Sequence, residues 1–198
     1  MTIRSVRQED LKEIARIHKQ AFIGRGLSGY SDRIVAKRYE LFRDTCIFLL
    51  NEEDMINGFI VGGSAHDLAA ARKRFFKENL ALCLFEAVMR PRDLVGRLKG
   101  LVWPPRPVEN FPAMQLLSIA VIGEARGTGL ASRLLAAFEA RLPANCTYAL
   151  SVDSQNRRAI DFYVKHGFRL EAISHPSLVF AKVTRSGQTV MNGYLDGA

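Results

Sequence analysis

Residues 114–131 read Met-Gln-Leu-Leu-Ser-Ile-Ala-Val-Ile-Gly-Glu-Ala-Arg-Gly-Thr-Gly-Leu-Ala. Positions 116–122 form an almost unbroken apolar run, which predicts a strand buried on both faces. A short polar turn follows, with glycine at 127 and 129. Beyond it, apolar residues recur at helical spacing at Leu130, Leu134, Leu135 and Phe138. The stretch therefore predicts a strand, a glycine-rich turn and a helix.

Such a turn is suited to binding an anion. The first amides of a helix have no partner within it and lie at the positive end of the macrodipole, and glycine lets a phosphate approach without meeting a Cβ. An ordinary tight turn between strand and helix gives the same Gly-x-Gly pattern. The turn by itself is thus a weak signal, and other parts of the chain must support it.

Arg126-Gly127-Thr128-Gly129-Leu130-Ala131 fits the Arg/Gln-x-x-Gly-x-Gly/Ala signature of the GNAT superfamily of acyl-coenzyme A dependent N-acetyltransferases. The strand before it also resembles theirs. Further on, the second half of the family pattern is matched at Leu150-Ser151-Val152, Asn156, Ala159, Phe162-Tyr163 and Gly167-Phe168. The resemblance spans roughly fifty-five residues, and a turn alone would not predict the distant second half.

The resemblance implies a mixed α/β fold with a mostly antiparallel central sheet flanked by helices. It also implies acetyl-CoA as co-substrate, with main-chain groups of the fourth strand paired to the coenzyme arm and the turn holding the pyrophosphate. The implied coenzyme-binding residues are Ile119, Ala120, Val121, Arg126, Gly127, Thr128, Gly129, Leu130, Ala131, Ser132 and Asn156.

Tyr163 stands where the family commonly places its general acid, seven residues after Asn156. Its phenol would protonate the sulfur that leaves the thioester, although a tyrosine packed between helix and sheet fits the sequence as well. Asn156 would bond the pantetheine arm, cap the following helix, or do both. The reaction requires no metal.

The proton acceptor departs from the family pattern. Some relatives that acetylate protein N-termini carry a glutamate twelve residues before the tyrosine, and here that position is Ser151. An alkylammonium has a pKa near ~10.4 and must lose a proton before it attacks. The remaining candidates are a water chain, His66, Asp67 and Glu109. The change makes a protein N-terminus less suitable as the acceptor and favours a small molecule.

Length and composition predict a single domain. A chain of 198 residues with 48% hydrophobic composition can bury a full core, so we expect one domain at 1–185 and a tail at 186–198. The charged start and the lack of a long apolar segment favour a cytoplasmic protein. Three cysteines at unrelated spacings predict neither a disulfide framework nor a zinc site.

Elsewhere the apolar periodicity predicts strands at 3–6, 46–50, 58–64, 147–152, 168–173 and 178–185, and helices at 11–22, from Ser31 through Arg43, and at 157–166. Asp10 and Ser31 are the predicted caps of the first two helices, and Gly167 is the predicted αL residue after the third.

Gly62-Gly63 predicts a bulge or a close approach. His18 is interpreted as a core or boundary histidine, and the loop at 24–30 as either part of the acceptor site or an ordinary turn.

Residues 68–106 form a helical basic insertion between the third and fourth strands, with one apolar stripe at Phe76, Leu80, Cys83, Leu84, Ala87 and Val88 and a second helix after Pro91. Between 72 and 106 there are nine Lys or Arg and three acidic residues, a local net charge of +6 within a chain total of +8. This segment could cover the sheet, hold an acidic acceptor, or touch an anionic membrane. No aromatic interleaving supports nucleic acid.

The sequence therefore predicts an acyltransferase that moves an acetyl group from acetyl-CoA to a primary amine of a small molecule, such as an amino sugar, a polyamine or an amino acid, by direct attack in a ternary complex. The alternatives are a catalytically idle acyl-CoA sensor and a peripheral protein that binds anionic surfaces through the insertion. The chain would act as a monomer or a homodimer.

Overall fold

The computed structural model describes residues 2–22, 26–52, 55–89, 112–174 and 176–184. Seven strands form one sheet in the order β1-β2-β3-β4-β5-β7-β6. Neighbouring strands are antiparallel except β4 and β5, which are parallel. The strands are β1 (Thr2–Ser5), β2 (Ile47–Glu52), β3 (Gly58–Ser64), β4 (Met114–Val121), β5 (Thr147–Asp153), β6 (Arg169–Ser174) and β7 (Ser177–Val183).

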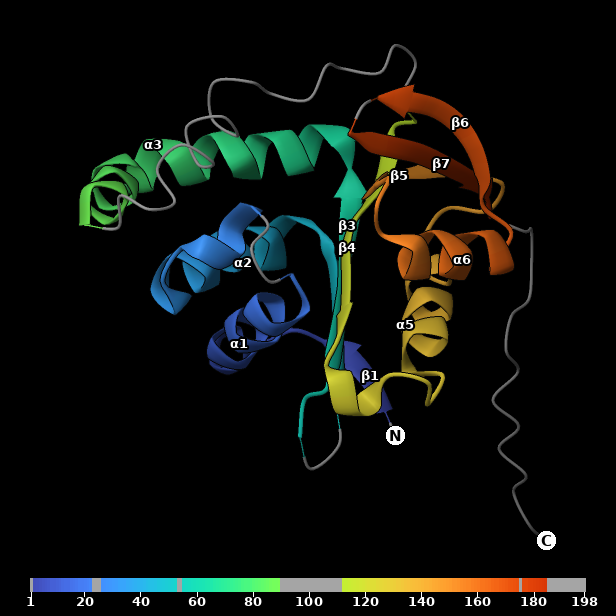
Figure 1. Cartoon of the computed structure of the whole chain (residues 1–198), viewed down its shortest axis with the longest axis horizontal. Helices are drawn as coiled ribbons and strands as arrows, with labels where there is room; N and C mark the ends of the chain where they lie inside the picture. The colour runs from blue at the N-terminus through green and yellow to red at the C-terminus, as the bar shows by residue number, and fades with distance from the viewer. Residues whose placement is uncertain (1, 23–25, 53–54, 90–111, 175, 185–198) are drawn as a thin grey trace, which may run out of the picture.

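Helices cover both faces of the sheet. Figure 1 shows α1, α2 and α3 on one side of β3 and β4, and α5 and α6 on the other. The helices are α1 (Leu11–Ala21), α2 (Asp32–Thr45), α3 (Ala65–Met89), α5 (Leu130–Glu139) and α6 (Arg157–Lys165), with 3-10 turns η1 (Gln8–Asp10), η2 (Gly26–Gly29) and η4 (Gly123–Ala125). This is the predicted mixed α/β fold, and α3 lies between the third and fourth strands as expected.

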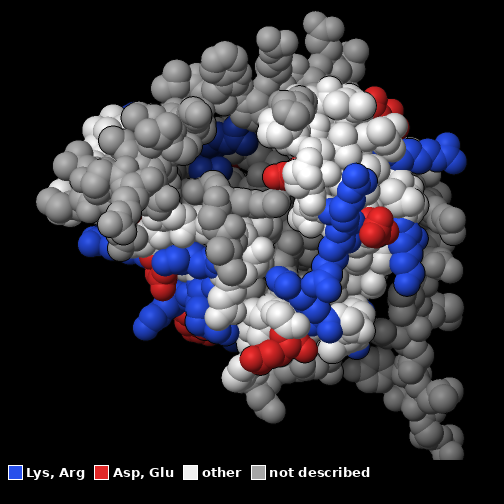
Figure 2. Space-filling view, viewed as in Figure 1, with Lys and Arg blue, Asp and Glu red and all other residues white. Residues whose placement is uncertain are grey.

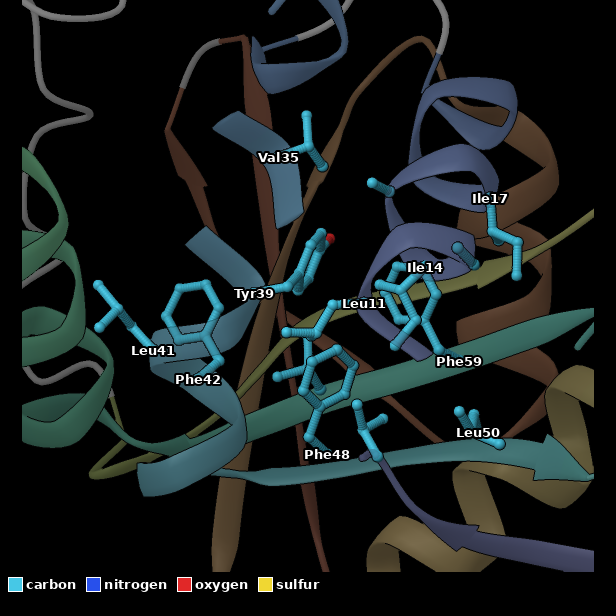
Figure 3. Close-up of a cluster of buried hydrophobic side chains, with 14 of the residues drawn as sticks. Leu11, Ile14, Ile17, Val35, Tyr39, Leu41, Phe42, Phe48, Leu50 and Phe59 are labelled. Carbon is cyan, nitrogen blue, oxygen red and sulfur yellow. The ribbon is translucent and has the colours of Figure 1, made fainter. Parts of the chain in front are cut away.

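A separate hydrophobic cluster lies on each side. On the α1 and α2 side, Tyr39 packs with its ring centroid 5.4 Å from that of Phe48 and 5.2 Å from that of Phe59 (Figure 3). On the α5 side, Tyr148 lies between Phe138 and Phe168, at 5.9 and 5.2 Å. The sheet is therefore held from both faces, and β4 contributes to both clusters.

Gly62 fulfils both parts of its prediction. The β3–β4 register shifts between Val61 and Gly62, so that Leu117 is an extra residue on β4. A Cβ at Gly62 would stand 2.4 Å from the Gln115 carbonyl oxygen and 2.7 Å from the Phe138 ring. Glycine is thus required where β3 meets β4 beneath α5.

Most predicted helix ends are confirmed. The Ser31 hydroxyl accepts from the amide of Ile34 at the start of α2, and Gly167 has a φ of 83° after α6. The prediction for Asp10 was wrong: its side chain does not cap α1. The Asp10 carboxylate instead accepts hydrogen bonds from the Arg7 amide and from the Arg4 guanidinium, because Arg4 on β1 is close enough to form an ion pair with it.

The predicted stripe of the insertion was wrong at Leu80 and Leu84 and was confirmed at Cys83 and Phe76. α3 begins at Ala65, directly after β3, and its most buried positions are Leu68, Ala71, Phe75, Asn79 and Cys83. Of the predicted stripe, Leu80 and Leu84 are 50% and 54% exposed. Asn79 is polar but buried, because its side-chain amide donates to the Phe75 carbonyl. The side chains of 87–89, the second helix and the tail at 186–198 lie outside the described residues.

Of the described helices, none is both long enough and apolar enough to span a bilayer. The predicted cytoplasmic location stays a prediction.

Candidate functional site

The sheet opens between β4 and β5. These strands pair only at Met114 with Tyr148 and at Gln115 with Ala149. Beyond Gln115, β4 continues to pair with β3 on its other edge, through Ile119, Ala120 and Val121. The separation explains why β4 is only half-buried at most of its positions, whereas the sequence predicted burial on both faces. It leaves one edge of β4 free for an extended ligand to pair with.

The turn after β4 exposes unpaired amides. Gly127 and Gly129 have φ of 85° and 81°, and a Cβ added at either would meet nothing within 4 Å. Among the described residues, no backbone amide between those of Arg126 and Arg133 has an acceptor; the Arg133 amide donates to the Gly129 carbonyl at 3.1 Å. Because these amides lie at the N-terminus of α5, the turn can hold a phosphate group.

Side chains add positive charge around this turn. Arg126 is exposed and its Nε donates to the Val121 carbonyl at 3.2 Å, which ties the turn to the end of β4. The Thr128 hydroxyl donates to the Ala125 carbonyl at 2.8 Å. Figure 2 shows a band of Lys and Arg side chains over α6 that runs down toward the turn before α5. The surface therefore suits a polyanionic ligand.

Tyr163 lies on α6, in the hydrophobic cluster on the α5 side of the sheet. It is 8% exposed and packs against Phe162 and Phe168, with ring centroids 5.4 Å away in both cases. Burial raises the pKa of Tyr163, so its hydroxyl stays protonated at neutral pH. The structure thus supports the packing role, and it leaves the phenol able to donate a hydrogen bond.

Comparisons with known proteins agree with this geometry. Residues 11–168 match the family model described as "Acetyltransferase (GNAT) family". The chain belongs to this family. The family and the fold identify it as an acyltransferase, and its family uses acetyl-CoA. A comparison of the sequence with curated proteins gave no match.

Solved structures share the GNAT fold at low identity. An N-acetyltransferase from Staphylococcus aureus Mu50 is 19% identical, with a TM-score of 0.63 over 92% of this chain and 100% of that one. The PaiA N-acetyltransferase from Thermoplasma acidophilum, solved with coenzyme A, is 16% identical, with a TM-score of 0.56 over 92% and 98%. The ribosomal-protein-S18-alanine N-acetyltransferase from Escherichia coli is 16% identical, with a TM-score of 0.54 over 96% and 97%.

His166 and Ser132 connect α6 and α5, and Asn156 caps α6. The Asn156 Oδ1 accepts from the Ala159 amide at 3.3 Å. The sequence missed His166, which ends α6. Its Nδ1 lies 2.7 Å from the Phe162 carbonyl and its Nε2 lies 2.9 Å from the Ser132 hydroxyl. The carbonyl can only accept, so Nδ1 carries a proton, and His166 joins α6 to the first turn of α5.

Two of the predicted proton acceptors, His66 and Asp67, are described by the structure. Both lie in the first turn of α3, where the Ser64 hydroxyl donates to Asp67 and accepts from the Asp67 amide. The bonds from Ser64 and then His66 lower the pKa of Asp67, which makes it a weaker base. Glu109 lies outside the described residues. Ser151 is exposed on β5. In the described part of the chain, no cluster of His, Cys, Asp and Glu could hold a metal.

A buried polar chain reaches the bulge of β4 from the α1 and α2 side, and the sequence missed most of it. The Tyr39 hydroxyl lies 2.8 Å from His18 Nδ1, and Ser118 on β4 acts on the pKa of Tyr39 in the direction opposite to the larger effect of burial. His18 is 8% exposed, as its interpretation as a core residue requires, and burial lowers the pKa of His18 to about 4. Its Nε2 is the single enclosed side-chain atom without a hydrogen-bond partner among the described residues. The sequence pattern gave no sign of a polar role for Tyr39, because an aromatic residue within a helix is usually read as part of its apolar face.

Proposed function

We propose that this protein transfers the acetyl group of acetyl-CoA to the primary amine of a small molecule, by direct attack of the amine in a ternary complex. The observation that carries the proposal is the separation of β4 from β5 beyond Gln115, next to a turn of unpaired amides. An extended thioester arm would pair with the free edge of β4, and its pyrophosphate would sit at residues 127–132.

The open space at Gly127 and Gly129 fits that ligand, since a Cβ at either position would occupy part of it. Main-chain groups of Ile119, Ala120 and Val121 would orient the arm, and one amide of β4 would polarise the reacting carbonyl. Asn156 caps α6 through Oδ1, which leaves its amide hydrogens to face the arm. Arg126 would add charge beside the pyrophosphate.

The bound coenzyme supplies an acetyl thioester. The amine nitrogen forms the new C–N bond as the C–S bond breaks, and the ammonium must first give up a proton. Tyr163 then donates to the departing sulfur. Because burial raises the pKa of Tyr163, complete transfer to a thiolate with a pKa near ~8.5 is uphill, so we assign the phenol chiefly a hydrogen-bonding role as negative charge develops.

We assign the acceptor to the small molecules because residue 151 is a serine and not a glutamate. The relatives that carry a glutamate at this position act on protein N-termini, and a serine hydroxyl cannot replace that carboxylate as a base. A water chain then takes the proton, with His66, Asp67 and Glu109 as the candidates to receive it. Two similar structures bear names of enzymes that act on other proteins, a histone acetyltransferase HPA2 and the S18-alanine enzyme. Acetyl transfer and the class of acceptor are therefore separate parts of the proposal, and the experiment tests each of them.

A thiol-release assay with acetyl-CoA and a panel of amino sugars, polyamines, amino acids and short peptides tests the proposal. We expect turnover with at least one small amine and little with peptides. Turnover with peptides alone would overturn the acceptor class. Tight acetyl-CoA binding without any acetyl transfer would favour the acyl-CoA sensor instead.

A further inference from the structure

Arg38 on α2 presents a guanidinium that forms no ion pair with an acidic residue in the described part of the chain. Its Cζ lies 5.7 Å from the ring centroid of Phe42 and 5.8 Å from that of Phe75 on α3. Both rings are buried, at 2% and 1% exposure, and Arg38 itself is half-buried. Among the described residues, it has neither a hydrogen-bond acceptor nor a carboxylate within ion-pair distance.

A second guanidinium adds to this charge. Arg72 on α3 is exposed and close enough for its charge, after the larger effect of burial, to lower the pKa of Arg38. Holding two positive charges close together beside apolar rings costs free energy, because each guanidinium loses part of its hydration and repels the other. A bound anion would offset both effects.

Arg38 is partly and not fully buried, so some of its side chain reaches the surface. The rings hold the planar guanidinium in place, so it is pre-organised to bind two oxygens of one group side by side. Sulfate, phosphate and carboxylate all have that geometry.

The position relates this site to the proposed reaction. Arg38 lies on α2, which packs against α3 and follows the loop at 24–30, a segment for which acceptor binding is one of the two roles expected from the sequence. Tyr30, from that loop, acts electrostatically on Arg38. An acceptor held by this loop could therefore place a second, negatively charged group between α2 and α3.

We propose that Arg38, assisted by Arg72, binds an oxyanion of the acceptor, either a carboxylate or a phosphate. This inference rests on the proposed acetyl transfer to a small amine and narrows it. Amino acids and phosphorylated amino sugars then qualify as acceptors, whereas polyamines and neutral amino sugars do not, since they would leave both guanidinium groups unpaired.

The first test compares acceptors in matched pairs: lysine with cadaverine for the carboxylate, and glucosamine 6-phosphate with glucosamine for the phosphate. The expected result is a higher kcat/KM for the anionic member of at least one pair. In Arg38→Met, which keeps an apolar stem against the rings, this preference should fall by about 10- to 100-fold through the acceptor KM, as expected for a lost charged hydrogen bond. The pair that responds identifies the anion.

Arg33→Met is the matched control, because Arg33 is exposed on the same helix and has no place in the site. It should keep the native preference, and the acetyl-CoA KM should be native in every variant. Arg72→Gln, an exposed change that spares the core, should reduce the preference in the same direction as Arg38→Met. Equal use of charged and neutral amines, or a preference that survives both substitutions, would overturn the proposal.

The second test requires no turnover, so it separates failure of this inference from failure of the proposed function. Sodium sulfate should raise the melting temperature above that in sodium chloride at equal ionic strength, by roughly 3 to 6 °C at about ten times the sulfate dissociation constant. The difference between the salts should shrink in Arg38→Met and persist in Arg33→Met. If it is the same in all three proteins, the site binds no oxyanion, whatever the enzyme acetylates.

Discussion

At the scale of single residues, burial keeps the polar groups around the opening of the sheet uncharged. It raises the pKa of Tyr163 and Tyr39 and lowers that of His18, and in each case the charged form is the one that loses hydration. Arg38 is the exception, because a guanidinium cannot be deprotonated at neutral pH. This contrast explains why an external anion is expected at Arg38 and not at His18.

Tyr163→Phe removes one hydroxyl and keeps the ring contacts with Phe162 and Phe168. If the phenol donates to the sulfur, turnover should fall by roughly 10²-fold while acetyl-CoA binding changes little. Steady-state kinetics and a binding titration measure the two effects. Tyr148→Phe is the control, since that hydroxyl already bonds Glu139 and has no role in the proposed reaction. Native turnover in Tyr163→Phe, under conditions where chemistry limits the rate, would leave Tyr163 with packing alone.

His18 predicts how stability depends on pH. Its pKa is about 4 when folded and near ~6.5 when unfolded, so between these values the unfolded chain binds more protons. Stability should therefore fall as pH drops from about 6.5 to 4, with His18 contributing about 2 to 3 kcal/mol of the loss. His18→Asn keeps a polar group for Tyr39 and removes the titration, so urea unfolding midpoints should decline less. His66→Asn, at an exposed side chain, should retain the native decline, and identical slopes in all three proteins would contradict the assignment.

At the scale of elements, the strand, turn and helix at 114–139 contribute different features to the site. β4 contributes an unpaired edge because β5 separates from it, and the turn contributes amides because its glycines hold positive φ. On α3, Phe75 and Cys83 belong to the hydrophobic cluster shared with α1 and α2, whereas Leu80 and Leu84 are exposed. A single stripe on α3 thus anchors it over α2.

Gly129→Asp and Gly129→Asn form an isosteric pair that tests the turn. Both side chains tolerate the left-handed conformation at Gly129, but only Asp places a negative charge beside the proposed pyrophosphate. Asp should weaken acetyl-CoA binding by at least about 10-fold relative to Asn, as measured by calorimetric titration. Equal affinities for the two variants would place the pyrophosphate elsewhere.

Phe75→Ala tests the anchoring of α3. Its side chain is 1% exposed, so removing the ring should lower the free energy of unfolding by about 3 to 5 kcal/mol. Leu80→Ala, on the same helix and 50% exposed, should stay within about 0.5 kcal/mol of the native protein. Urea titrations of the two variants give both values. Similar losses would mean that the burial pattern of α3 differs from the one described.

At the scale of the whole molecule, the two faces of the sheet have different roles. The α5 and α6 face carries the turn, Tyr163 and the band of basic side chains, whereas the α1, α2 and α3 face carries the polar chain to β4 and the Arg38 site (Figures 1 and 2). The chain as a whole has a formal charge of +8. Under the two proposals above, the coenzyme would bind on the first face and the anionic group of the acceptor on the second.

The positive net charge of the chain predicts that acetyl-CoA binds more weakly as the salt concentration rises. Screening has a Debye length near ~8 Å at physiological ionic strength, so raising salt should increase the acetyl-CoA KM. Acetyl-dephospho-CoA, which lacks the ribose phosphate, should respond less steeply. Initial rates for both donors at low and high sodium chloride measure the difference. Parallel responses would indicate that the exposed arginines do not contact that phosphate.

The sequence by itself determined the family, the strand–turn–helix at 114–139 and most strand positions, because apolar periodicity and glycine placement are local properties. It also placed Asn156 and Gly167 at the two ends of α6. The tertiary structure alone decided the opening between β4 and β5, the stripe of α3 and the meeting of His18, Tyr39 and Ser118. Each of these depends on which distant segments pack together: Asn79 is buried by a bond to its own helix, and Arg38 is isolated because Phe42 and Phe75, rather than a carboxylate, surround it.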